Sequence, residues 1–253
     1  MSRHVSARSR GTAIVACAIG LAALAIPAAP ALAADRLPDL QMVRPRDLKI
    51  DTSTVPGRKL LRYTAVIVNA GTGPFEVHGD RADTSAAMTV TQRIYDSSAT
   101  GHHDIATAAT MFYAGDGHNH WHLRDLETGE LIRPDNGVKV GTLAKHGFCF
   151  YDNVAWRLSL TGAPQSPFYT NCGNASSLHI VPGLSIGWGD KYPWSIAFQY
   201  IDITGLANGR YRLQTGASTS LGFQESNLSN NSSWVEIRLA SHSAKVTANG
   251  PGA

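Results

Sequence analysis

The sequence predicts an all-β protein, most simply an antiparallel β-sandwich with long loops and little helix. After residue 33, no segment keeps a helical periodicity for more than two turns. Many short segments instead alternate polar and apolar residues and are rich in β-branched and aromatic side chains. Turns rich in Gly, Pro and Asn separate these segments, as is typical of a sandwich. The roughly 220 residues that follow residue 33 are enough for one sizeable core.

The first 33 residues have the pattern of a secretory signal. A basic start that includes Arg3 and Arg10 precedes an apolar run over 12–26, and 31–33 form a small-x-small cleavage site. The apolar run is too short for a comfortable membrane span, and no stop-transfer pattern follows it. We therefore expect cleavage before Ala34, secretion to the extracellular space and no membrane span afterwards.

The signal segment also accounts for the positive charge of the chain. It carries three arginines and no acid, which leaves 19 basic and 19 acidic residues in the rest. A neutral mature chain gives no support for nucleic-acid or membrane-surface binding. We expect one domain over 34–240 and a disordered tail over 241–253, which is small and polar.

In the first half of the chain, the clearest strand covers 60–69, which is β-branched and roughly alternating. A turn at 69–74 leads to a return strand from Phe75. Residues 34–58 are expected to be irregular, and 102–113 could be loop or strand. Further strands are predicted from the same alternation at 88–95, 118–122, 125–132, 148–151, 199–204, 211–215 and 234–239.

Three segments near these strands have compositions typical of loops or turns. Residues 161–177 are rich in loop-forming residues. Residues 183–193 are glycine-rich and aromatic, which favours a shaped loop over a strand in a ladder. Asn208-Gly209 is a hairpin signal, so we expect 199–204 and 211–215 to pair with each other.

The motif His118-Asn119-His120-Trp121-His122 is the main chemical signal. In a strand, its three imidazoles would point to one face, and neutral imidazole suits copper, zinc, nickel or iron. No cysteine or carboxylate completes the set inside the motif, which favours an open site over a closed structural zinc site. The alternative is a polar strand face with three solvated histidines.

Cys149 and Cys172 are the two cysteines that remain after the signal segment. An even pair without metal-ligand spacing in an oxidising exterior predicts one disulfide. The alternative is a pair of free thiols.

Four separated motifs resemble, in order, those of the lysyl oxidase family, the copper- and quinone-dependent protein-lysine oxidases. They are His118 to His122, Ala144 to Asp152 around Lys145, Gly189 to Tyr192 seven residues before Gln199 to Thr204, and Glu225 to Asn231. The order and approximate spacing agree across 37–239.

The resemblance implies copper at His118, His120 and His122, and a lysine tyrosylquinone built from Lys145 and Tyr192. It implies oxidation of primary amines, either protein lysine side chains or small amines, by O₂ to aldehydes with release of ammonia and hydrogen peroxide. Asp190 is a candidate general base, although a loop-capping aspartate is the alternative.

The resemblance also implies a structural calcium. The matching positions are Asp39, Leu40, Glu225, Asn227, Asn230 and Asn231. Asn227 stands where the family usually has an aspartate, which removes one negative charge from a site whose affinity depends on charge. The alternative is a turn whose asparagines hydrogen-bond their own backbone.

Two non-enzymatic interpretations remain open from the sequence. A secreted copper- or zinc-binding module would bind metal and leave Lys145 and Tyr192 unmodified. A structural adhesion sandwich would bind no metal tightly. Neither requires a lysine and a tyrosine in these two motifs.

Overall fold

Strand β4 (Leu60–Asn69) is the centre of one sheet in this computed structural model, which describes residues 1–2, 33–98, 100–114 and 117–253. Every residue of β4 is buried, so both of its faces contact other parts of the protein. All its partners are antiparallel to it. They are β2 (Leu40–Met42), β3 (Arg46–Asp51), β15 (Trp188–Tyr192) and β16 (Tyr200–Asp202), with β12 (Val154–Ala155) beside β15.

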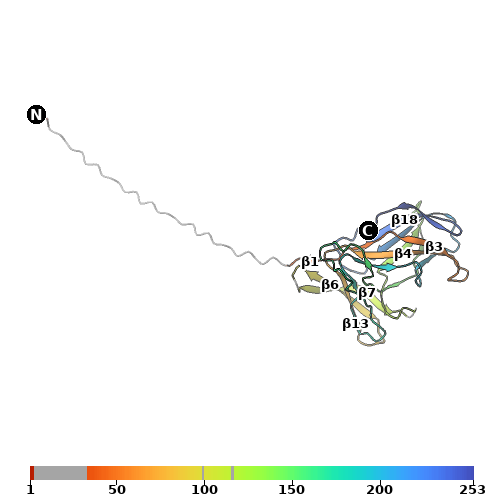
Figure 1. The fold of residues 1–253 in the computed structure, drawn as a ribbon, viewed down its shortest axis with the longest axis horizontal. Helices are drawn as coiled ribbons and strands as arrows, with labels where there is room; N and C mark the ends of the chain where they lie inside the picture. The colour runs from red at the N-terminus through yellow and green to blue at the C-terminus, as the bar shows by residue number, and fades with distance from the viewer. Residues whose placement is uncertain (3–32, 99, 115–116) are drawn as a thin grey trace. The chain divides into compact units, whose positions relative to one another are not determined.

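A larger sheet has eight strands. Its order is β11 (Gly147–Phe148), β8 (Trp121–Arg124), β7 (His102–Tyr113), β6 (Met88–Asp96), β5 (Phe75–Asp80) and β13 (His179–Ile180), with β1 (Asp35–Arg36) on β6 and β14 (Gly183–Leu184) on β5. In Figure 1, β6, β7 and β13 lie on one side of the folded unit and β3, β4 and β18 on the other.

The third sheet has five strands and shows the alternation expected of a sheet with one buried face. Its order is β10 (Lys139–Thr142), β9 (Glu127–Ile132), β17 (Gly209–Ala217), β18 (Ser232–Leu239) and β19 (Ala244–Asn249). Tyr211, Leu213 and Val235 are among the side chains that it buries.

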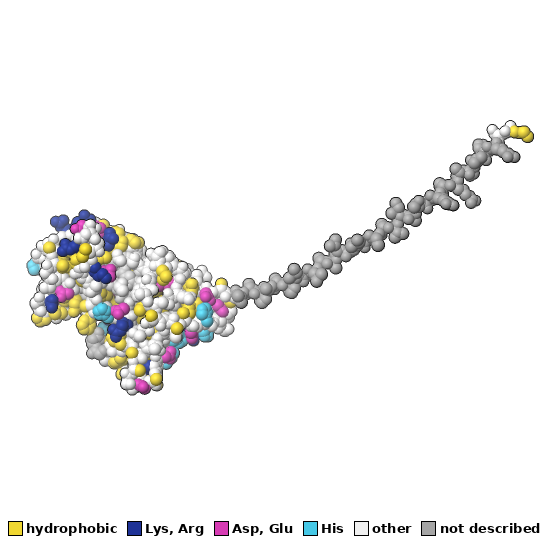
Figure 2. All heavy atoms as spheres, turned by 180° about the vertical axis from the view of Figure 1, so that it is seen from behind, with side chains coloured by type: hydrophobic (Ala, Val, Ile, Leu, Met, Phe, Trp, Pro, Cys, Tyr) yellow, Lys and Arg dark blue, Asp and Glu magenta, His cyan; other side chains and the backbone are white. Residues whose placement is uncertain are grey.

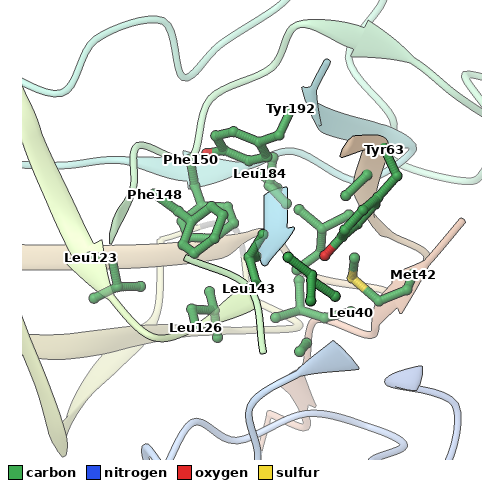
Figure 3. Close-up of a cluster of buried hydrophobic side chains, with 14 of the residues drawn as sticks. Leu40, Met42, Tyr63, Leu123, Leu126, Leu143, Phe148, Phe150, Leu184 and Tyr192 are labelled. Atoms are coloured by element: carbon green, nitrogen blue, oxygen red, sulfur yellow. The ribbon is translucent and has the colours of Figure 1, made fainter. Parts of the chain in front are cut away.

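The hydrophobic core lies where the inner faces of the sheets meet. Figure 3 shows Leu40, Met42 and Tyr63 facing a group that contains Phe148 and Phe150. These five side chains have no measurable exposure to solvent. The core therefore joins the β4 sheet to the segment that carries Lys145.

The predicted all-β class is confirmed, and the described residues contain no helix. Strand β4 has the predicted bounds, and 102–113, left open between loop and strand, form the strand β7. Among the parts that the structure describes, none is a helix long and apolar enough to cross a membrane. Nearly all of the predicted signal lies outside the described residues.

Several local predictions are wrong. Residues 188–192 form strand β15 on β4, because small and aromatic residues fit against an entirely buried neighbour. The hairpin at Asn208-Gly209 does not exist, since β16 pairs with β4 and β17 pairs with β9 and β18. The strand predicted over 148–151 is only the two residues of β11, Gly147–Phe148.

The two ends of the domain are also more regular than predicted. The segment 34–58 contains β1, β2 and β3, each of which pairs with a strand further along the chain. The tail predicted to be disordered forms β19, which pairs with β18 from Val235 to Leu239. Backbone hydrogen bonds to a long neighbouring strand order these polar residues despite their composition.

On the face drawn in Figure 2, basic and acidic side chains are interspersed.

Arg62 of β4 connects the sheet to the chain that follows Tyr192. Its Nε lies 2.6 Å from Asp51 Oδ2, and its NH1 donates to the carbonyls of Trp194 and Ile196 at 3.0 and 3.1 Å. The Arg62 side chain is only 5% exposed. A buried guanidinium with this many acceptors fixes the loop after β15.

We expect Arg62→Met to lower the free energy of unfolding by about 3 kcal/mol, because it removes the buried ion pair with Asp51 and leaves two carbonyls without their donor. Urea unfolding of the folded domain measures the loss. Arg58→Met is the matched control, since the Arg58–Asp202 pair is exposed and an exposed pair contributes at most about 1 kcal/mol. Equal effects of the two substitutions would contradict the role given to Arg62.

Candidate functional site

The three histidines of the motif converge on one point. The ring centres are 4.8 Å apart for His120 and His122, 5.6 Å for His118 and His120, and 5.7 Å for His118 and His122. One ligand atom from each lies within 4.8 Å of the others, and Nε2 of His120 is 3.0 Å from Nε2 of His122. Three imidazoles so arranged form a donor set that fits a single transition-metal ion.

The backbone reaches this arrangement differently from the prediction. Strand β8 begins at Trp121, so His122 alone of the three is in a strand. His118 and His120 precede it in a turn, in which the His120 amide donates to the His118 carbonyl at 2.9 Å. The predicted strand over His118 to His122 is therefore wrong in its first half.

Lys145 is held beside the histidine strand. Two residues further on, β11 pairs with β8, so that Gly147 faces Arg124 and Phe148 faces Leu123. Lys145 is 4% exposed, and its Nζ lies 5.7 Å from the ring centre of Tyr192 and 5.4 Å from that of Phe148. Residues 47 positions apart in the sequence thus meet in the interior.

Tyr192 reaches the same place from the other sheet. It is the last residue of β15, where it faces Ala65 of β4, and it is 6% exposed. Its ring stands edge-on to Phe148 with centres 4.9 Å apart, as Figure 3 also shows. Burial raises the pKa of Tyr192 well above its ordinary value, and the neighbouring Asp190 adds to the rise.

The Cys149–Cys172 disulfide lies between these segments and is formed as predicted. The Tyr192 hydroxyl donates to the Cys149 carbonyl at 2.8 Å. The Trp121 amide donates to the Cys172 carbonyl at 2.9 Å. One covalent link therefore ties the histidine segment, the lysine segment and the tyrosine strand together.

Two buried acids lie behind the Lys145 and Tyr192 side chains. Asp190 is fully buried in β15 and accepts a hydrogen bond from the Asn153 side chain, so it does not cap a loop. Burial raises its pKa, and the hydrogen bond from Asn153 opposes the rise. Glu127, which the sequence reasoning missed, is 2% exposed, and burial also raises its pKa to about 8. The sequence does contain a pattern that could have identified Glu127, because this residue alternates with Gly129 and Leu131 on the buried face of β9.

A hollow of about 430 Å³ joins the groups. Its lining includes the three histidines, Lys145, Asp190 and Tyr192. A second hollow of about 240 Å³ shares Lys145 and His122 with the first, and Phe112 and Phe198 give it apolar walls. An apolar surface therefore lies next to the buried groups.

The late motif meets the early Asp39-Leu40 pair. Glu225 Oε2 accepts from the Leu40 amide at 2.6 Å, and Glu225 Oε1 accepts from Asn231 Nδ2 at 2.8 Å. Asp39 Oδ1 accepts from Asn230 Nδ2 at 2.9 Å. Burial raises the pKa of Glu225 to about 7.

Two amide oxygens of this cluster, Oδ1 of Asn230 and of Asn231, are buried and accept no hydrogen bond from the described residues. Such oxygens suit a hard cation. Asn227 does not join them, because its Oδ1 accepts from the amide and hydroxyl of Ser229 in its own turn. Five of the six predicted positions are thus brought together.

The fold and the site define an all-β protein with three convergent histidines, able to hold one metal ion, beside a buried lysine and tyrosine. The lysyl oxidase family model matches residues 88–249. This chain belongs to the lysyl oxidase family.

Curated relatives agree with this assignment. Lysyl oxidase homolog 3 from Homo sapiens and from Mus musculus is 30% identical to this chain over 125 residues, which are 49% of this chain and 15% of each relative. Lysyl oxidase homolog 3A from Danio rerio is 28% identical over a stretch of the same length. The chain therefore matches only a small part of these longer proteins.

Gly147 permits the close contact between β11 and β8. A Cβ atom there would lie 2.5 Å from Phe112 Cζ and 2.6 Å from His122 Nδ1. We expect Gly147→Ala to displace His122 and to weaken the binding of added copper, used as a probe of the three-histidine group, by about 10- to 100-fold, the usual effect of disturbing the surroundings of a ligand. Competition with a chelator measures the affinity.

Gly209→Ala is the matched control, because its nearest neighbour is 3.9 Å from the added Cβ. Copper affinity of Gly147→Ala equal to that of the control would contradict the packing described for His122.

Proposed function

We propose that this protein is a copper-dependent amine oxidase that converts primary amines, chiefly peptidyl-lysine ε-amines, to aldehydes with release of ammonia and hydrogen peroxide. Membership of the lysyl oxidase family supports the proposal. The observation that carries it is the 5.7 Å distance between Lys145 Nζ and the Tyr192 ring centre, inside a hollow that the three histidines also line.

His118, His120 and His122 would hold the copper ion, because their nitrogen donors converge and imidazole binds this metal well. Copper with O₂ would supply oxidation of the Tyr192 ring, and the lysine tyrosylquinone made from Lys145 and Tyr192 would supply the electrophile for the amine. The Cys149 carbonyl orients the Tyr192 hydroxyl. The surrounding aromatic side chains exclude water from the Lys145 amine.

The substrate class follows from the two hollows. Phe112 and Phe198 offer apolar surface for the methylene groups of an alkyl amine. The neighbouring hollow leads to Tyr192. Protein lysine side chains and small primary amines both have this chemistry, and O₂ is the second substrate.

The setting that fits this chemistry is extracellular. The signal pattern over 1–33 predicts secretion. The Cys149–Cys172 disulfide is of the kind that persists in an oxidising compartment.

The oxygen cluster around Asp39 and Glu225 would hold a structural calcium ion. The two carboxylates are ligands that calcium prefers, as are the amide oxygens of Asn230 and Asn231, which accept no hydrogen bond within the described part of the chain. The ion would tie the N-terminal segment to the chain before β18.

Turnover of amines by the copper-loaded, aerobically incubated protein tests the proposal. Hydrogen peroxide production from a simple alkyl amine and from a lysine-containing peptide is the measurement. Tyr192→Phe and Lys145→Arg should reduce it to the level of the copper-free protein, because each removes one half of the cofactor.

Tyr151→Phe and Lys191→Arg are the matched controls, since both residues line the same hollow. Turnover by Tyr192→Phe or Lys145→Arg at the rate of these controls would refute the cofactor assignment. Copper binding without turnover in the wild-type protein would favour a non-catalytic copper- or zinc-binding module.

A further inference from the structure

Glu127 is a buried acid to which none of the described residues donates a hydrogen bond. It points inward from β9 and is 2% exposed. Both of its carboxylate oxygens are buried, and none of the described residues donates a hydrogen bond to them. An ionised carboxylate in such surroundings is costly, whereas the protonated acid is far less so.

Asp190 is equally buried, and its Oδ2 also has no donor among the described residues, but its Oδ1 has one. Its Oδ1 accepts a hydrogen bond from the Asn153 side-chain amide. Asn153 is itself fixed, because its Oδ1 accepts from the Lys191 amide at 2.9 Å. A donated hydrogen bond stabilises the ionised form of a carboxyl group. Of the two acids, Asp190 is therefore the better site for a negative charge.

The two acids interact with each other and with the site. Burial raises the pKa of Glu127 to about 8, Asp190 adds to the rise, and Lys145 opposes it. The pKa of the Tyr63 hydroxyl is raised by burial and by Glu127, and the pKa of Tyr192 is raised by burial, by Asp190 and by Glu127. Two acids in one apolar pocket do not both ionise near neutral pH.

We propose that Glu127 is a positioning residue that holds a proton at neutral pH and so leaves the negative charge of the pair on Asp190, beside Tyr192. The role of the Asp190 charge in catalysis rests on the proposed function. There, the Asp190 carboxylate would accept the proton that the α-carbon of a bound amine loses, and the lysine tyrosylquinone would supply the acceptor for the electron pair of that C–H bond.

Infrared spectra of the copper-free mature protein test the proposal without any turnover. At neutral pH, the carbonyl stretch of a protonated carboxylic acid should be present and should shift when the glutamates carry ¹³C. The same label on the aspartates should leave it in place. A band that shifts with labelled aspartate would overturn the proposal, because Asp190 would then hold the proton.

Variants identify which glutamate contributes. Glu127→Gln should lose part of the band, and the part that remains belongs to Glu225, whose pKa burial raises to about 7. Glu130→Gln is the matched control on the same strand, since Glu130 is partly exposed and paired with Lys139, and it should lose nothing. In Asp190→Asn the Glu127 band should remain, because burial, the main cause of its raised pKa, is unchanged.

An unaltered band in Glu127→Gln would overturn the proposal. The spectra do not depend on the quinone. If the wild-type protein does not oxidise amines while Glu127→Gln still loses part of the band, the proposed function is refuted and the protonation of Glu127 is supported.

Discussion

The arrangement of the site depends on the disulfide between Cys149 and Cys172. Its two residues use their carbonyls to bind the Tyr192 hydroxyl and the Trp121 amide. Trp121 lies between two of the histidines, and Cys149 follows Lys145 by four residues. A bond that closes a loop of this size stabilises a fold by about 3 kcal/mol. Here, it also brings together three segments that belong to two different sheets.

Strand pairing within the sheets holds the segments of the site more rigidly than the disulfide does by itself. Strand β4 binds β15 through four residue pairs and fixes Tyr192 opposite Ala65. Strand β8 carries His122 and binds β11, next to Lys145. The buried aromatic Phe148 fills the space between these strands and contacts both Lys145 and Tyr192. His122 and Tyr192 lie on strands, which position side chains more precisely than loops do, and Lys145 lies two residues before β11.

The sequence predicted the elements with a strong local pattern and missed those that depend on a distant partner. The bounds of the strand Leu60–Asn69 are predicted correctly, because its β-branched and alternating residues form a continuous run in the sequence. Strand β15 was missed because its glycines reflect close approach to β4, which no local pattern reveals. The histidines, Lys145 and Tyr192 were found from motifs, whereas Glu127 was not. A single acid on a buried strand face becomes meaningful only when its neighbours are known.

The central claim is that Lys145 and Tyr192 become one cofactor in the presence of copper. Peptide mass mapping of the mature protein after exposure to copper and O₂ tests it most directly. The account predicts one cross-linked peptide that joins the segments around Lys145 and Tyr192, with a quinone absorbance that phenylhydrazine shifts. Two separate, unmodified peptides from a protein that has bound copper would contradict it.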